Sequence, residues 1–327
     1  MSAAAGMPGR RALDAGRATE RLRATGIALP FAALFITLSI ASSSFLTKVN
    51  LLNILDQQAA TLIIAAAGTL VLVAGGIDLS VGAVYSLAGV TGAELASRTS
   101  PVIAIVLGVG VGLAVGLANG LVVTRLRINA LIATLAMSFV VSGLGTLITH
   151  GNLVVLFEHQ EFGNLARTLV LGVKTSIWIA VIAVVVIGVL LARTTAGRYM
   201  YASGGNAEAA RLAGVRVDAI RVLTFVVSGG AAGLAGVIDA SRVLSAQASS
   251  GDTLAFTVLA GIVVGGTSIL GGEGAVWRTV LGVLFIALIG NGYDLLGLDP
   301  LYEQITLGVI LLAAVGIDSW ARSRPDR

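Results

Sequence analysis

The sequence has no cysteine and little charge. Without thiols there is no disulfide, no thiolate metal site and no cysteine nucleophile. Charged residues make up 12% of the 327 positions. A soluble domain has about 25%, so too little polar surface is left to face water. Hydrophobic residues make up 56% and recur in continuous runs of near-spanning length. The sequence therefore predicts an all-α polytopic membrane protein.

Several enzyme motifs are also missing. No H-E-x-x-H is present, and the only histidines, His150 and His159, share one expected outer loop. No G-x-x-x-x-G-K-[ST] phosphate loop occurs, and the only lysines are Lys48 and Lys174. The chain is therefore expected to have no catalytic, metal or cofactor site. Any ATP that drives it must be hydrolysed by a separate subunit. Its basic residues follow membrane topology, so no nucleic-acid partner is expected.

Ten apolar segments are candidates for membrane spans. They cover roughly residues 26–44, 51–74, 79–97, 101–123, 128–149, 174–192, 222–240, 253–271, 275–290 and 303–320. Residues 1–25 contain five arginines and no apolar run, so they are expected to form a disordered basic cytoplasmic tail. Residues 26–321 then form a single transmembrane domain, with a short cytoplasmic tail at 322–327.

The distribution of basic residues tests this topology. With both termini cytoplasmic, sixteen of the 21 lysines and arginines fall in inner segments. The other five fall outside, at Lys48, Arg98, Arg167, Lys174 and Arg242. This bias follows the positive-inside rule, and losing or adding one span would reverse every loop beyond it. The pattern therefore predicts ten spans with both ends inside.

Four charged side chains lie within or beside the expected spans, namely Asp56, Glu94, Asp239 and Arg242. Ionisable residues in membranes are functional candidates by default, but charges at helix ends commonly reach the interface. A structural or interfacial role is therefore favoured for each, and no buried chain of carboxylates suggests a proton relay. For the longest outer loop, 150–173, docking of a ligand and simple solvation both remain open.

The inner loop 193–221 holds the most informative polar segment. Asn206 is a good helix N-cap, Glu208 suits the positive end of a helix dipole, and Gly214 is a natural C′ residue. The residues between them predict about two turns of helix, with Glu208 and Arg211 able to pair on one face. Such a rigid knob would be either a linker helix or a docking element, and the residues alone leave both open.

A short polar interruption separates the second and third spans. It contains Gly75, Gly76, Asp78 and Ser80. In one interpretation a glycine ends the second helix as its C′ residue, and Asp78 or Ser80 caps the third. In the other, the break lies deeper, because residues 59–74 make roughly 24 Å of helix, short of a ~30 Å hydrocarbon core. Broken helix ends at that depth must be buried in protein or line a cavity, where they would offer hydrogen-bonding groups to a solute.

Four segments of the chain resemble a known family. They read AGGIDLSVGAV, NALIATLAM, TTAGRYMYASGGNAEAARLAGV and GIVVGGTSILGGEGAV. In this order and spacing they are similar to the permease subunits of bacterial ABC importers for simple sugars, the ribose-transport permease family. The resemblance covers about residues 45–320, which leaves the basic tail outside the pattern.

The resemblance implies a set of partners and a site. Such permeases work in pairs, as two copies or with a paralogue, in the lipid bilayer of the bacterial inner membrane. Two cytoplasmic ATP-binding subunits hold the ATP and Mg²⁺, and an extracytoplasmic sugar-binding protein delivers the solute. The stretch that corresponds to the ATPase-coupling segment contains Gly204, Gly205, Asn206, Glu208, Ala209, Arg211 and Gly214.

A second glycine-rich run resembles the first interruption. Gly265, Gly266, Thr267 and Ser268 again place paired glycines and then hydroxyl residues after an apolar helix. This similarity indicates an internal repeat of the kind found in transporters. Both runs are therefore candidates for the translocation path.

Other functions remain open at this point. A sugar is neutral and forms hydrogen bonds, so the scarcity of buried charge fits a sugar permease that works by alternating access. A secondary transporter or channel for a small polar solute would share the hydropathy. An ABC permease for a non-sugar solute, such as an amino acid, would share the motifs.

Overall fold

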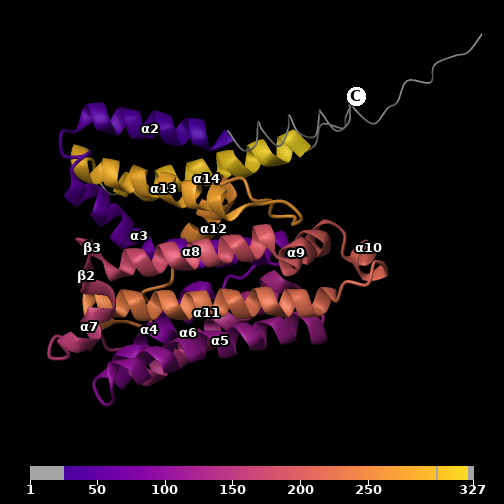
Figure 1. The fold of residues 1–327 in the computed structure, drawn as a ribbon, viewed down its shortest axis with the longest axis horizontal. Helices are drawn as coiled ribbons and strands as arrows, with labels where there is room; N and C mark the ends of the chain where they lie inside the picture. Colours follow the sequence, from indigo (N-terminus) through magenta and orange to yellow (C-terminus); the bar gives the residue numbers. More distant parts are fainter. Residues whose placement is uncertain (1–25, 300, 323–327) are drawn as a thin grey trace, which may run out of the picture.

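The computed structural model describes residues 26–299 and 301–322. The expected tail at 1–25 and residues 323–327 lie outside the described residues, so those predictions stay predictions. The described part is built from helices whose axes lie mainly along one common direction, together with very short strand pairs (Figure 1). α7 (Gln160–Arg167) and the strands β2 (Leu169–Val170) and β3 (Val173–Lys174) lie at one end, and α9 (Thr195–Gly205) and α10 (Ala207–Leu212) lie at the other.

Ten helices coincide with the ten expected spans. They are α2 (Ala28–Ala41), α3 (Lys48–Val73), α4 (Val81–Ala96), α5 (Pro101–Arg125), α6 (Ala130–Thr149), α8 (Thr175–Arg193), α11 (Val217–Val243), α12 (Leu254–Val264), α13 (Val276–Leu296) and α14 (Leu301–Arg322). Among the described helices, six are long and apolar enough to cross a membrane, namely α3, α5, α6, α8, α11 and α13. The chain is thus a polytopic helical membrane protein, while ten crossings and cytoplasmic termini remain predictions.

Local chemistry sets where several of these helices begin. The side chain of Thr47 accepts a hydrogen bond from the backbone N–H of Asn50 at 3.3 Å and so caps α3. Pro101 occupies the first helical position of α5, where a missing N–H does little harm. Asn129 caps α6 by accepting from the N–H of Leu131 at 2.9 Å.

Two expected spans have the wrong bounds, and two helices were not expected. α12 ends at Val264 rather than near 271, because the paired glycines stop it there. α11 begins at Val217, inside the stretch expected to be a cytoplasmic loop. The unexpected helices are α7 in the outer loop and α9 in the inner loop. Each of these two helices is short, so its helical pattern of apolar residues is weak compared with the long apolar runs.

α11 is the centre of the packing and lies against α5, α4 and α3. Its contact with α5 depends on glycine: a Cβ added at Gly112 would lie 2.3 Å from the carbonyl oxygen of Gly229. A Cβ at Gly116 would lie 2.3 Å from that of Phe225. Small residues allow membrane helices to approach at backbone distance, which explains part of the high glycine content.

A small cap covers the end opposite α9 and α10. β1 (Val154–Val155) pairs with β4 (Ser245–Ala246), and α7 packs on α11. Leu156 and Phe162 are at most 1% exposed. Part of this loop therefore has an apolar core of its own, while many of its residues, including His150, stay exposed, so docking and solvation both remain open.

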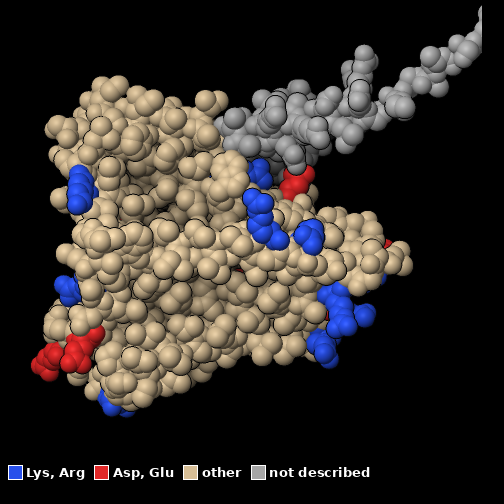
Figure 2. All heavy atoms as spheres, viewed as in Figure 1, with Lys and Arg blue, Asp and Glu red and all other residues tan. Residues whose placement is uncertain are grey.

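Basic side chains gather around one end of the molecule. Figure 2 shows several basic side chains, all of them arginines in the sequence, near the end formed by α9 and α10, with the flanks of the long helices almost free of charge. The uncharged flanks agree with the large apolar side chains that α5, α6 and α8 leave exposed, as on a lipid-facing surface.

Candidate functional site

The short helix α10 forms a capped knob. The Asn206 side chain accepts hydrogen bonds from the N–H groups of Glu208, at 3.1 Å, and Ala209, at 2.9 Å. Gly214 has a φ of +84° and closes the other end. The predicted N-cap and C′ residue are thus confirmed. The predicted pair of Glu208 with Arg211 is wrong, since Arg211 Nη2 donates to Asp218 Oδ1 at 2.9 Å.

α9 places the predicted coupling segment against the end of α3. Its last turn ends at Gly204 and Gly205, and Gly204 lies so close to α3 that an added Cβ would be 1.9 Å from the Val73 carbonyl oxygen. The same Cβ would be 2.6 Å from the backbone nitrogen of Gly272, which itself donates to the Val73 oxygen at 2.9 Å. A Cβ added at Gly205 would have nothing within 4 Å. An added methyl group would therefore clash at Gly204 and meet open space at Gly205.

α3 ends in a glycine-dependent turn. Gly75 has a φ of +80°, and its N–H donates to the Leu72 oxygen at 2.9 Å. The N–H of Gly76 donates to the Val71 oxygen, also at 2.9 Å. These are the two hydrogen bonds of a Schellman motif. Gly75 is the C′ residue, as one of the two interpretations of this stretch expected.

Asp78 follows that turn and joins three helices. Its Oδ1 accepts from the N–H of Ser80 at 3.0 Å and from Ser80 Oγ at 2.6 Å, and its Oδ2 accepts from Ser228 Oγ of α11 at 2.8 Å. Asn119 Nδ2 of α5 donates to Ser80 Oγ at 2.8 Å. The expectation that Asp78 or Ser80 caps α4 is wrong in its usual form, because the Ser80 side chain makes no capping bond. Asp78 instead anchors the start of α4 to its neighbours.

α12 ends in the same way as α3. Gly266 has a φ of +83°, and its N–H donates to the Val263 oxygen at 2.8 Å. The N–H of Thr267 donates to the Ile262 oxygen at 3.2 Å. Gly265 is the C-cap, and a Cβ there would lie 2.5 Å from the Arg278 oxygen. The likeness predicted for the two glycine-rich runs therefore extends to their backbone geometry.

Three segments far apart in the sequence meet at this end. We call them the cytoplasmic junction, after the side on which the sequence places them: residues 73–76 at the end of α3, residues 201–205 of α9 and residues 271–274 after α12. A Cβ at Gly271 would lie 2.9 Å from Cα of Gly75. Tyr201 Oη donates to the Gly274 oxygen at 2.7 Å. Burial raises the pKa of the Tyr201 phenol, so it remains a neutral donor.

A cavity opens beside the junction. Its volume is about 530 Å³, and Gly75 and Gly76 form part of its wall. Arg211, Asp218 and Arg221 also line it, so the knob and the helix end face a common polar space. Sequence reasoning missed Tyr201, Gly271 and Gly272, whose only early signal was their place within motifs TTAGRYMYASGG and GTSILGGEGAV.

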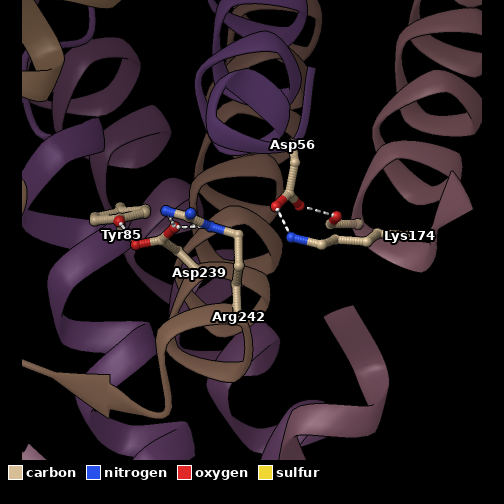
Figure 3. Close-up of polar contacts among 6 residues, drawn as sticks. Asp56, Tyr85, Lys174, Asp239 and Arg242 are labelled. Atoms are coloured by element: carbon tan, nitrogen blue, oxygen red, sulfur yellow. Dashed lines mark hydrogen bonds and ion pairs between the residues drawn. The ribbon is translucent and has the colours of Figure 1, made fainter. Parts of the chain in front are cut away.

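Two networks of paired charges lie at the other end (Figure 3). Asp56 of α3 accepts from Lys174 Nζ at 2.5 Å and from the Ser176 hydroxyl, which ties α3 to α8. Asp239 accepts from Arg242 Nη2 at 2.6 Å and from Tyr85 Oη at 2.6 Å, which ties α11 to α4. Removing one partner of a buried pair is strongly destabilising. These networks fit the structural role favoured from the sequence.

The fold and the junction together define a class. This is a polytopic helical membrane protein in which a capped surface knob is joined directly to two interrupted helices. Comparison with known proteins gives the family: residues 50–315 match the model described as "Branched-chain amino acid transport system / permease component". The chain belongs to this family of transport permeases.

Individual relatives narrow the comparison. The ribose import permease protein of Bacillus subtilis is 40% identical over 267 residues, which cover 80% of this chain and 83% of that protein. The ribose import permease protein of Escherichia coli is 36% identical over 266 residues, covering 79% and 83%. The L-arabinose transport system permease protein of Escherichia coli is 38% identical over 267 residues, covering 81% of each. No solved structure matches the chain.

Proposed function

We propose that this chain is the permease subunit of an ATP-driven ABC importer for a simple sugar such as ribose or arabinose, in the bacterial inner membrane. The names of relatives at 36–40% identity support this function. The family description mentions branched-chain amino acids. The assignment of a sugar as the substrate therefore depends on the named relatives and on the chemistry of the chain.

The cytoplasmic junction carries the proposal. Two ATP-binding subunits, which hold the ATP and Mg²⁺, dock on α10, and this chain binds no cofactor itself. The Leu212 side chain at the end of α10 is 86% exposed and offers an apolar contact. When the ATPases close, α10 moves and α9 moves with it. Because Gly204 sits against Val73 and Gly272, the motion reaches both interrupted helices directly.

Transport then follows from alternating access. Two permeases, either two copies or this chain with a paralogue, tilt relative to each other, and a central path changes from facing inward to facing outward. An extracytoplasmic sugar-binding protein delivers the solute to the outward-facing state. The glycine-terminated ends of α3 and α12 are placed where they can change with the knob, which supports their role near the path.

Reconstitution tests the function. In proteoliposomes that contain this chain, its ATPase and its binding protein, labelled ribose or arabinose is expected to accumulate only with ATP. The purified permease alone should hydrolyse no ATP. Robust sugar uptake by this chain alone, without ATP, would contradict the proposal and favour a secondary transporter or channel.

A knob variant tests the coupling. Glu208→Arg places a cation in the first turn of α10, where the helix dipole favours an anion. We expect sugar-stimulated ATPase activity to fall at least tenfold while the permease still inserts and binds lipid normally. Ala219→Arg, an exposed position near the start of α11, is the matched control. If the Glu208 variant and the wild type had equal sugar-stimulated ATPase activity, α10 would not be the element that couples the ATPases to the permease.

A further inference from the structure

An amide-rich cavity lies between α3, α12, α13 and α14, away from the cytoplasmic junction. Its volume is about 430 Å³, within the range of roughly 300–1,000 Å³ typical of small-molecule sites. Its polar lining includes Asn53, Gln57, Gln58, Thr257, Asn291 and Glu303. So many neutral hydrogen-bonding groups are unusual in the walls of a membrane protein, because burying an unpaired amide is unfavourable.

The lining begins as a polar stripe on α3. Asn50, Asn53 and Gln57 follow one another at helical spacing, so they share one face of the helix. Gln57 lies nine residues from the start of α3, which is roughly 13 Å along the axis. The stripe therefore begins at the end of α3 opposite the junction and reaches the level of Asp56, with Asn53 and Gln57 exposed along it.

Hydrogen bonding within the cavity is uneven. Asn50 and Asn291 bond to each other twice, at 3.1 and 2.9 Å, and so lock α3 to α13. In contrast, the structure of the described residues contains no hydrogen bond to the side chains of Asn53, Gln57 or Gln58. Each of these amides keeps donors and an acceptor available. The cavity thus combines an Asn50–Asn291 pair that joins two helices with amide side chains that have no hydrogen-bond partner among the described residues.

α13 and α14 each add a carboxylate to the same cavity. Glu303 packs against α13 where there is no side chain: a Cβ at Gly290 would lie 2.7 Å from Glu303 Oε1. Asp294 also lines the cavity, and no lysine or arginine does so among the described residues. Carboxylates accept hydrogen bonds from hydroxyls. The carboxylate of an amino acid would face them without a counter-ion, so the lining disfavours that class of solute.

We infer that this cavity is a binding site for a neutral polyhydroxyl solute, the sugar that the importer carries. The inference rests on the proposed function and names the groups that hold its substrate. Sugar hydroxyls both donate and accept, so they match amides that can do the same. Gln57 and Asn53 form the centre of the site, since they line it and have no partner of their own.

The absence of native cysteine provides a direct test. Gln57→Cys introduces the only thiol, and its labelling by a polar maleimide is followed in the reconstituted transporter without ATP. Ribose or arabinose is expected to slow labelling at least threefold, and leucine is expected to have no effect. Gln304→Cys, an exposed residue beside Glu303 that does not line the cavity, is the matched control and should be labelled at the same rate with or without sugar.

Two outcomes overturn the inference. One is unchanged labelling of Gln57→Cys by a sugar that the wild-type transporter demonstrably carries, and the other is protection by leucine alone. If Gln57→Cys does not fold, Asn53→Cys serves in its place. Failure of the wild type to take up any sugar with ATP would instead contradict the proposed function, so the two results are distinguishable.

Discussion

The ends of α3 and α12 close in the same way but continue differently. Both use a glycine at positive φ and the same pair of backbone hydrogen bonds. After α3, the Asp78 carboxylate accepts three hydrogen bonds and is anchored to α4 and α11. After α12, the chain turns back on itself, with the N–H of Ser268 donating to the Glu273 oxygen at 3.0 Å.

This difference lies in how each end is anchored. The Thr267 hydroxyl after α12 is buried and has no hydrogen-bond partner, whereas both carboxylate oxygens of Asp78 accept hydrogen bonds. The segment after α12 is bonded through its backbone to α3 and directly to α9, because the Gly272 N–H donates to the Val73 oxygen and Tyr201 Oη of α9 donates to the Gly274 oxygen. We therefore expect the segment after α12 to respond more strongly to α9 than the segment after α3, although both contact Gly204.

Blocking the shared contact should have the largest effect. In Gly204→Ala the new Cβ would lie 1.9 Å from the Val73 oxygen, so the backbone of α9, α3 or both must shift. Overpacking of this kind typically costs about 1–3 kcal/mol. We expect sugar uptake to fall at least tenfold, with a lower melting temperature in detergent.

The neighbouring glycine supplies the control. Gly205→Ala adds a methyl group where nothing lies within 4 Å, and replacing glycine in a helix can stabilise it by roughly 0.5–1 kcal/mol. Its uptake should match the wild type. Similar uptake in the two variants would show that close contact at Gly204 does not transmit motion.

Removing the anchor after α3 should have the next largest effect. Asp78→Ala leaves the Ser228 hydroxyl, which is fully buried, without its acceptor. Loss of hydrogen bonds to a charged acceptor should lower the free energy of unfolding by roughly 1–3 kcal/mol. Uptake and unfolding are measured together, with Ser268→Ala, which loses only the bond from the Leu270 N–H, as comparison. An Asp78→Ala protein that assembles normally but does not transport would place Asp78 on the solute path instead.

Sequence reasoning located the elements better than their connections. Apolar runs located a helix within each of the ten expected spans, because a long apolar run is a strong and local signal. The caps at Asn206 and Gly214 were also predictable, since capping depends on residues within one turn. The partner of Arg211 was not, because Asp218 reaches it from the next helix and not from the face of its own.

The site shows the same limit more clearly. Sequence reasoning offered Gly75 or Gly76 as the end of α3, but it extended α12 past Gly266 to about residue 271. The contacts of Gly75, Gly271 and Gly272 with Gly204 join segments that lie far apart in the sequence, and no local pattern encodes them. The amide stripe of α3 was not identified from the sequence, because only packing against α13 and α14 makes it part of a cavity.

The smallest expected effect concerns the segment after α12. Thr267→Val keeps the shape of the side chain and removes a buried hydroxyl that has no partner. Because an unsatisfied buried hydroxyl is unfavourable, we expect the free energy of unfolding to stay level or to rise by up to about 1 kcal/mol. The melting temperature should follow it. Thr69→Val on α3 is the matched control, since its hydroxyl bonds to Thr279 Oγ1 at 2.7 Å and its loss should destabilise the protein.

Sugar uptake by the Thr267→Val variant then tests whether the Thr267 hydroxyl takes part in transport. A protein selected only for stability has no reason to keep an unpaired buried hydroxyl, so a partner in another conformation or in the solute would explain it. In that case Thr267→Val is at least as stable as wild type and transports several-fold more slowly. Unchanged uptake would remove Thr267 from the candidate path and leave the difference between the two helix ends a matter of packing alone.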